Sequence, residues 1–234
     1  ETKITRKERW AFGLAGLGQN MVYNYTTAYI MVFYTDVVLI APIAVGTMML
    51  VARIFDAVND PILGNFIDRH PSPKGKLIPY LKAVPIPMFV LSVLVYLVPD
   101  MSPALKLLYV YVSFILWDLM YTVSDVPYWG LSVTITDDAK ERLSLISLAR
   151  VLCNIGLAVS IVIPPLLISA WGGGQRAYLL TAILMASIGS LLFSLVGRHA
   201  KERVIANNRE RTSFKNLLQN RGLIILQSSR VLQA

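Results

Sequence analysis

The sequence predicts an all-α membrane protein with six transmembrane helices. Of the 234 residues, 55% are hydrophobic and only 15% are Asp, Glu, Lys or Arg, and the mean hydropathy is +0.57. A soluble domain carries about 25% charged residues. The apolar residues also gather in six blocks of roughly 20 residues, which is the length of helix that crosses ~30 Å of hydrocarbon. These observations exclude a soluble globular protein, a coiled coil and a disordered chain.

The first two predicted spans, 10–34 and 43–67, are separated by a short loop that ends at Pro42. The first span contains three glycines, Gly13, Gly16 and Gly18. Because no strand precedes these glycines and they lie in an apolar block, they favour close helix packing over a phosphate-binding loop. The middle of this span is unusually polar for a membrane helix, with Gln19, Asn20, Tyr23, Asn24 and Tyr25.

The other four spans are each bounded by loops rich in Pro, Gly or charged residues. They are predicted at 77–98, 104–130, 143–169 and 177–197. The loop before the third span is strongly basic, the loop before the fourth contains Pro99 and Pro103, and the loop before the sixth contains three consecutive glycines.

The distribution of Lys and Arg predicts the orientation. The chain has a net charge of +8, and its basic residues concentrate in the N-terminal tail, the loops 68–76 and 136–142, and the segment 198–221. The opposite side has Lys106 and Arg176. By the positive-inside rule we expect the N-terminus and 198–221 in the cytoplasm and the chain in the cytoplasmic (inner) membrane, in contact with lipid. This pattern is not a nucleic-acid patch, so no nucleic-acid partner is expected.

The domain organisation predicted from these patterns has three parts. Residues 1–197 form an N-terminal six-helix bundle, 198–221 form a cytoplasmic linker, and 222–234 begin a seventh helix that is incomplete, because thirteen residues cannot cross a bilayer as a helix. The chain begins at Glu1 without Met. We therefore expect a fragment that lacks a C-terminal six-helix half, with a naturally truncated, non-transporting half as the alternative.

Charged residues inside the second span are candidates for function, because a charge in the bilayer is costly. Asp56 and Asp60 are four residues apart and share a helix face, with Asn59 beside them and Arg53 one turn back. Two carboxylates and an amide oxygen suit a small hard cation such as sodium, or the carboxylate pair can hold a proton. A structural Arg53–Asp56 ion pair is the alternative.

The fourth span contains a second polar face. Asp118, Thr122, Asp125 and Trp129 follow a spacing of four, three and four residues, which places them on one side of a helix. A carboxylate one turn from an indole is typical of sugar binding, because the carboxylate accepts hydroxyl hydrogen bonds and the ring covers the apolar C–H face. Arg150 can neutralise Asp125 or donate to a sugar hydroxyl, and Asp118 has no assigned role.

Two further classes of site are not expected. Cys153 is the only cysteine, so the chain has no disulfide and no CxxC metal pair; we expect no cofactor and no transition metal. Intramembrane aspartyl proteases place their carboxylates on two helices, with a Gly-x-Gly-Asp sequence that is absent here, whereas Asp56 and Asp60 lie on one helix. An enzyme is therefore not expected.

Three runs of sequence resemble the glycoside–pentoside–hexuronide:cation symporters, a branch of the major facilitator superfamily typified by melibiose permease. The runs are Tyr34-Thr35-Asp36-Val37-Val38, Ala52-Arg53-Ile54-Phe55-Asp56-Ala57-Val58-Asn59-Asp60-Pro61 and Tyr121-Thr122-Val123-Ser124-Asp125-Val126-Pro127-Tyr128-Trp129. A cytoplasmic motif of the superfamily, a conformational latch, is matched by Gly64, Asp68, Arg69, Gly75 and Lys76. The resemblance covers the N-terminal six helices of a family member and implies the N-terminal bundle of a major-facilitator-type transporter.

The resemblance implies residue roles in a cation-coupled sugar transporter. The coupling-cation site would be formed by Asp56, Asn59, Asp60 and Thr122, and the sugar site by Asp125, Trp129 and Arg150, with Tyr121 nearby. Where melibiose permease has a Lys-Asp pair that contributes to sugar binding, this chain has Gln19-Asn20, so a glycoside other than a galactoside is expected.

The implied mechanism is symport by alternating access, with a glycoside and a monovalent cation bound near the bilayer midplane between two pseudo-symmetric halves. Sodium is the expected cation, with lithium or the proton as alternatives. Related carriers suggest a second cargo, a lysolipid or other amphiphile, for which Met- and Phe-rich spans would suit an acyl tail.

Overall fold

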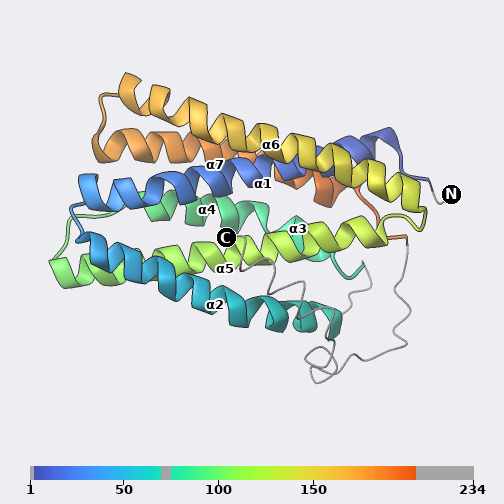
Figure 1. The fold of residues 1–234 in the computed structure, drawn as a ribbon, viewed down its shortest axis with the longest axis horizontal. Coiled ribbons are helices and arrows are strands. Elements are labelled where there is room, and N and C mark those ends of the chain that lie inside the picture. The colour runs from blue at the N-terminus through green and yellow to red at the C-terminus, as the bar shows by residue number, and fades with distance from the viewer. Residues whose placement is uncertain (1–2, 70–74, 204–234) are drawn as a thin grey trace, which may run out of the picture. The chain divides into compact units, whose positions relative to one another are not determined.

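The computed structural model describes residues 3–69 and 75–203, and the elements of these residues are helices (Figure 1). In chain order they are α1 (Arg6–Val32), the π-helical turn η1 (Phe33–Val37), α2 (Pro42–Arg69), α3 (Ile78–Ala83), α4 (Pro85–Tyr96), α5 (Pro103–Thr134), α6 (Ala139–Ala170) and α7 (Gly174–His199). The predicted seventh-helix start at 222–234, and the linker beyond residue 203, lie outside the described residues.

Each of the six predicted spans coincides with helix, as an all-α membrane fold requires. Four described helices, α2, α5, α6 and α7, are long and apolar enough to cross a membrane by length and composition, and α4 is a shorter apolar helix. The third predicted span, 77–98, is divided at Val84 into α3 and α4. The division has a local cause, because Pro85 has no amide hydrogen and its ring crowds the preceding turn.

The polar first helix, α1, packs mainly against α6 and α7, and these three helices lie together along one side of the bundle in Figure 1. A Cβ atom on Gly18 would collide with the backbone of Gly189 in α7, and one on Gly156 in α6 would collide with the backbone of Leu17. The expectation that glycines of the first span serve close helix packing is therefore confirmed at Gly18.

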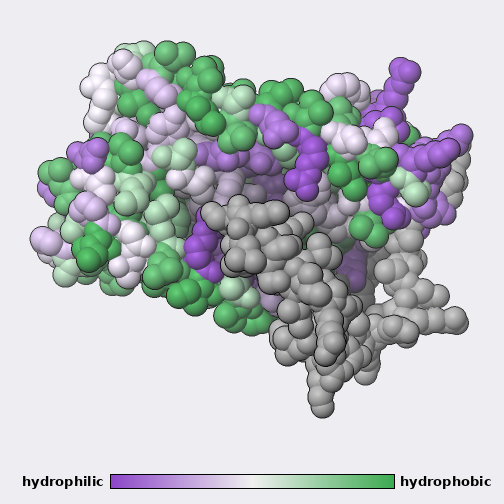
Figure 2. Space-filling view, in the orientation of Figure 1, coloured by the Kyte–Doolittle hydropathy of each residue, from purple (hydrophilic) through white to green (hydrophobic). Residues whose placement is uncertain are grey.

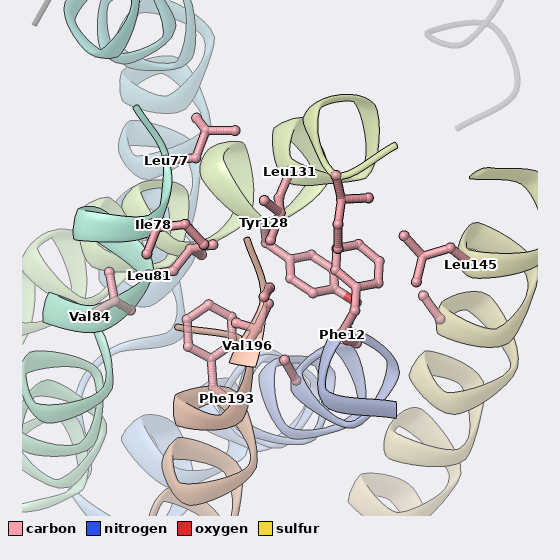
Figure 3. Close-up of a cluster of buried hydrophobic side chains, with 14 of the residues drawn as sticks. Phe12, Leu77, Ile78, Leu81, Val84, Tyr128, Leu131, Leu145, Phe193 and Val196 are labelled. Atoms are coloured by element: carbon pink, nitrogen blue, oxygen red, sulfur yellow. Dashed lines mark hydrogen bonds between the residues drawn. The ribbon is translucent and has the colours of Figure 1, made fainter. Parts of the chain in front are cut away.

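Two apolar clusters form the core of the bundle. In the cluster of Figure 3, the rings of Phe12 and Tyr128 stack with centroids 4.4 Å apart, and the Tyr128 hydroxyl donates to the Phe12 carbonyl oxygen at 2.9 Å. Leu131 of α5 and Phe193 of α7 are fully buried around them. This contact fixes α5 against α1 close to the polar face of α5 described below.

The outer faces of the helices are apolar. Large hydrophobic side chains such as Ile43, Leu166 and Leu191 are 63–81% exposed, and Figure 2 shows hydrophobic residues over much of the outer helices, with hydrophilic residues gathered near the N-terminus. An exposed apolar surface of this extent suits contact with lipid.

We call the end of the bundle at which α1 begins and α7 ends the proximal end. There, Glu202 and Arg203 contact the ends of several helices. The Glu202 carboxylate accepts hydrogen bonds from the backbone amides of Lys76, Leu77 and Ile78 at 2.7–2.9 Å. The Arg203 amide donates to the Thr134 carbonyl at the end of α5. This short segment therefore joins the end of α7 to the beginning of α3 and the end of α5.

Candidate functional site

A polar cavity of about 150 Å³ lies between α1, α2 and α5. Four carboxyl groups, one guanidinium, two phenols and a hydroxyl line it. Its residues are Tyr23 of α1, Arg53, Asp56 and Asp60 of α2, and Asp118, Tyr121, Thr122, Asp125 and Val126 of α5. Because two helices contribute the acidic groups, the cavity brings together the two polar faces that helical spacing predicts separately.

The α2 wall of the cavity contains the expected cation-site residues Asp56 and Asp60. The Arg53 guanidinium lies 3.8 Å from the Asp56 carboxylate, yet the Arg53 side chain is 65% exposed, so this is a loose ion pair. Asp56 Oδ1 and the Asn59 amide nitrogen are buried with no hydrogen-bond partner. Asn59 does not line the cavity. The unpartnered Asp56 oxygen is an acceptor that a small cation can use.

The α5 wall contributes Thr122, which is 6% exposed, and Asp118, which is 7% exposed. Asp118 lines the same cavity as Asp56 of α2. The spacing of four residues between Asp118 and Thr122 places Asp118 on this face, but the sequence does not reveal its proximity to Asp56.

Within the described residues, no group of three or more His, Cys, Asp or Glu is arranged to hold a metal ion.

Aromatic rings form one side of the cavity. Tyr23 stacks on Tyr121 with ring centroids 4.1 Å apart, and Tyr23 also lies 6.0 Å from the ring of Trp117. Trp117 is held in place by a hydrogen bond from its indole nitrogen to the Ser92 hydroxyl at 3.1 Å. Tyr23 and Tyr121 both line the cavity, so aromatic side chains form part of its wall.

Of the two amide residues expected near a sugar, Gln19 is fully buried and lies behind the cavity wall. Its amide nitrogen donates to Ser124 Oγ at 2.8 Å and to Asp125 Oδ1 at 3.2 Å. Asn20 is half-buried, and its amide nitrogen donates to the Gly16 carbonyl of its own helix. The structure thus brings Gln19 to Asp125 and leaves Asn20 bonded within α1.

Trp129 and Arg150 form a separate contact beside the cavity. The Arg150 guanidinium carbon lies 4.7 Å from the centroid of the Trp129 ring, which is a cation–π arrangement. Within the described residues, no salt bridge joins Arg150 to Asp125. The sequence suggests that Arg150 neutralises Asp125 or donates to a sugar hydroxyl. In this structure the Arg150 guanidinium instead contacts the indole of Trp129, one helical turn beyond Asp125.

The expected latch residues lie in the last turns of α2 and just before α3, toward the proximal end. The Arg69 guanidinium donates to Asn65 Oδ1 at 2.9 Å, and a Cβ atom on Gly64 would meet nothing within 4 Å. Gly75 has a φ of +107°, a conformation that glycine adopts without strain, and it lies against the Glu202 carboxylate. Lys76 donates its amide to Glu202. The side chain of Asp68 lies outside the described residues.

The sequence matches the family described as "MFS/sugar transport protein" over residues 11–232. It is 32% identical over 233 residues to the uncharacterized symporter YnaJ of Bacillus subtilis (strain 168), across 96% of the chain and 50% of that protein. It is also 32% identical over 222 residues to the isoprimeverose transporter of Lactiplantibacillus pentosus, across 91% of the chain and 46% of that protein.

A third relative is the inner membrane symporter YicJ of Escherichia coli (strain K12), which is 36% identical over 173 residues, across 74% of the chain and 38% of that protein. The chain therefore spans about half the length of the curated relatives it matches. These relatives are named as membrane transporters and not as enzymes, in agreement with the expectation from the sequence. With a family match across nearly its whole length and a multi-pass helical fold, the chain belongs to the MFS/sugar transport protein family, a branch of the major facilitator superfamily.

Proposed function

We propose that this chain is the N-terminal half of a secondary transporter that moves a glycoside together with sodium across the cytoplasmic membrane by alternating access. The observation that carries the proposal is the cavity in which Asp56 and Asp60 of α2 face Asp125 of α5. Such a cavity inside a membrane bundle offers carboxylates to a cation and hydrogen-bond acceptors to a sugar within one small volume.

In this proposal sodium binds among Asp56, Asn59, Asp60 and Thr122. The buried Asp56 Oδ1, which has no hydrogen-bond partner, and the buried Thr122 support this assignment. A cation there bridges α2 and α5 and so holds the α5 face on which Asp125 lies. Because the two binding events share α5, each ligand raises the affinity of the other by the same factor.

The sugar site in this proposal is formed by Asp125, Trp129 and Arg150, with Tyr121 nearby and the Gln19-Asn20 pair behind it. Asp125 accepts hydroxyl hydrogen bonds, while the ring of Trp129, already paired with the Arg150 guanidinium, covers the apolar face of the sugar. The isoprimeverose transporter among the relatives suggests a disaccharide of that kind as the first substrate to test.

The orientation and the other parts of the transporter belong to the same proposal. The basic tail, loops and 198–221 segment support a cytoplasmic N-terminus. The missing C-terminal six-helix half would supply the opposite wall of the substrate cavity, since the chain spans about half the length of its relatives. The latch residues Gly64, Asp68, Arg69, Gly75 and Lys76 would act at the cytoplasmic end.

The test is uptake of radiolabelled isoprimeverose into membrane vesicles that contain the longest natural form of this chain. We expect an imposed sodium gradient to stimulate uptake, and Asp60→Asn to abolish the stimulation. Asp137→Asn is the matched control, because Asp137 is an exposed residue in the loop between α5 and α6 and should leave uptake unchanged.

Other outcomes of the uptake experiment would change the coupling ion, the substrate or the assignment as a transporter. Uptake driven only by a pH gradient would replace sodium by the proton, and stimulation by lithium alone would replace it by lithium. Competition by a lysolipid but not by glycosides would overturn the sugar assignment in favour of an amphiphile. Absence of any uptake by a folded, inserted protein would reject the transporter proposal in favour of a non-transporting half.

A further inference from the structure

The hydrogen bonds of Gln19 define its role more sharply than its place in the sequence does. Gln19 is fully buried, and its amide nitrogen contacts both Ser124 Oγ at 2.8 Å and Asp125 Oδ1 at 3.2 Å. Both partners are on α5, so this single side chain joins α1 to the face of α5 that lines the cavity.

The direction of each hydrogen bond follows from the chemistry of the partners. The Ser124 hydroxyl donates to the Tyr121 carbonyl oxygen at 2.7 Å, so its oxygen must accept the bond from Gln19. An ionised Asp125 carboxylate can only accept. Nε2 of Gln19 therefore faces both partners, and its two hydrogens are both used.

This arrangement leaves Gln19 without a donor for a ligand. Its remaining polar atom, Oε1, is buried and has no hydrogen-bond partner within the described residues. A direct hydrogen bond to a sugar would require Gln19 to release Asp125 or Ser124. Asp125, in contrast, lines the cavity, so its carboxylate can meet a ligand there while Gln19 holds Oδ1 from α1.

We propose that Gln19 is a positioning residue, which holds one oxygen of the Asp125 carboxylate from α1 and so fixes the orientation in which that carboxylate meets a hydroxyl group of the substrate. This inference rests on the proposed sugar site. It replaces direct sugar contact by Gln19 with an action through Asp125, and it assigns Ser124 to the same network as the acceptor that orients the Gln19 amide.

The first test uses Gln19→Glu, which keeps the shape of the side chain but replaces both donor hydrogens by an acceptor. The introduced carboxylate would face that of Asp125, and we expect the KM for isoprimeverose uptake to rise more than tenfold. The maximal rate should change less than threefold, because Gln19 does not itself line the cavity and acts on the affinity for the sugar through Asp125.

The second variant, Gln19→Asn, removes the contact without adding a charge, since the shorter side chain cannot reach α5. It is expected to raise the KM in the same way if Gln19→Glu fails to fold. The control for Gln19→Glu is Asn24→Asp, the same amide-to-carboxylate change, because among the described residues the Asn24 amide donates to the Asn20 carbonyl of its own helix and Asn24 is not part of the cavity lining. A KM within threefold of wild type in Gln19→Asn would overturn the proposal.

A measurement that needs no substrate separates this inference from the proposed function. The thermal unfolding midpoints of Gln19→Asn, Asp125→Asn and the double variant form a double-mutant cycle. Non-additive shifts establish the Gln19–Asp125 coupling even if the wild-type protein takes up no isoprimeverose, in which case only the proposed function fails. Additive shifts would show that Gln19 does not hold Asp125 and would overturn the inference.

Discussion

At the scale of single residues, one buried ion pair stands apart from the cavity. Glu8 is 3% exposed, and its carboxylate lies 2.9 Å from the Arg203 guanidinium. Glu8 also forms a reciprocal capping box with Thr5 at the start of α1. A buried carboxylate that loses its partner is strongly destabilising, because the remaining charge has no compensation.

The Glu8 pair predicts a specific acid sensitivity. Burial acts to raise the pKa of Glu8, but hydrogen bonds from Arg203 and Thr5 outweigh burial, and the pKa lies below its ordinary value of 4.5. A carboxyl with a lowered folded-state pKa stabilises the fold above its unfolded pKa and loses this contribution as the pH falls through the folded-state value. We therefore expect the unfolding midpoint to fall on acidification below about pH 4.5.

The variant Glu8→Gln tests this account by thermal unfolding across pH. We expect it to destabilise the protein by about 3 kcal/mol at neutral pH and to weaken the acid-dependent fall. Asp137→Asn again serves as the control. An acid transition of unchanged size in Glu8→Gln would show that other carboxyls cause it.

At the scale of elements, α3 is a helix of six residues. Its N-terminus is capped by Glu202, a residue that follows α7 in the chain. The N-terminal amides of a helix lack partners within the helix. Glu202, three residues beyond the end of α7, accepts hydrogen bonds from three amides at this start. A negative charge at a helix N-terminus is also favoured by the helix dipole.

Removal of this cap is expected to weaken the proximal end of the bundle. Glu202→Ala should lower the free energy of unfolding by about 1–2 kcal/mol and raise hydrogen exchange at the start of α3, because the amides of Lys76, Leu77 and Ile78 lose their acceptor. Hydrogen exchange followed by mass spectrometry measures this locally, with peptides of α6 as the internal reference. Unchanged protection of α3 would contradict the capping role.

The same elements show what the sequence predicts well. The spacing of Asp56 and Asp60, and of Asp118, Thr122 and Asp125, identifies two polar helix faces, because helical periodicity is a local property. The cavity between α2 and α5 contains residues of both faces. The break in the helix at Val84 is harder to predict from the sequence. Three prolines lie near it, and only packing decides which of them ends a helix.

Contacts between helices are not predictable in this way. The partners of Gln19 are more than 100 residues away in the chain, and Arg150 of α6 meets the ring of Trp129 of α5. Periodicity assigns a side chain to a face but does not give the helix that the face meets. The pairing of α1 with α6 and α7, rather than with its neighbour α2, decides these contacts.

At the scale of the whole molecule, the charge of the cavity predicts which glycosides enter. Four carboxyl groups and one guanidinium line it, so an anionic substrate meets repulsion in a region of low dielectric constant. Methyl glucoside and methyl glucuronide differ at one carbon, a neutral CH₂OH group against a carboxylate. We expect the glucoside to compete with isoprimeverose uptake at a concentration at least tenfold lower. Equal competition by the two would show that the acidic groups do not govern selection.

The position of α1 between α6 and α7 also has a consequence for biosynthesis. Among the described helices α1 leaves the ribosome first, but the surfaces that enclose it are completed only when α7 has been made, about 170 residues later. At about 5–20 residues per second, this interval is on the order of ten to thirty seconds. In the first part of that time, before α5 has been made, Gln19 has none of its α5 partners, and until α7 has been made Gly18 lacks the Gly189 backbone against which it packs. Of the described helices, α1 therefore waits longest for the helices that enclose it, and its surroundings are complete only when α7 is present.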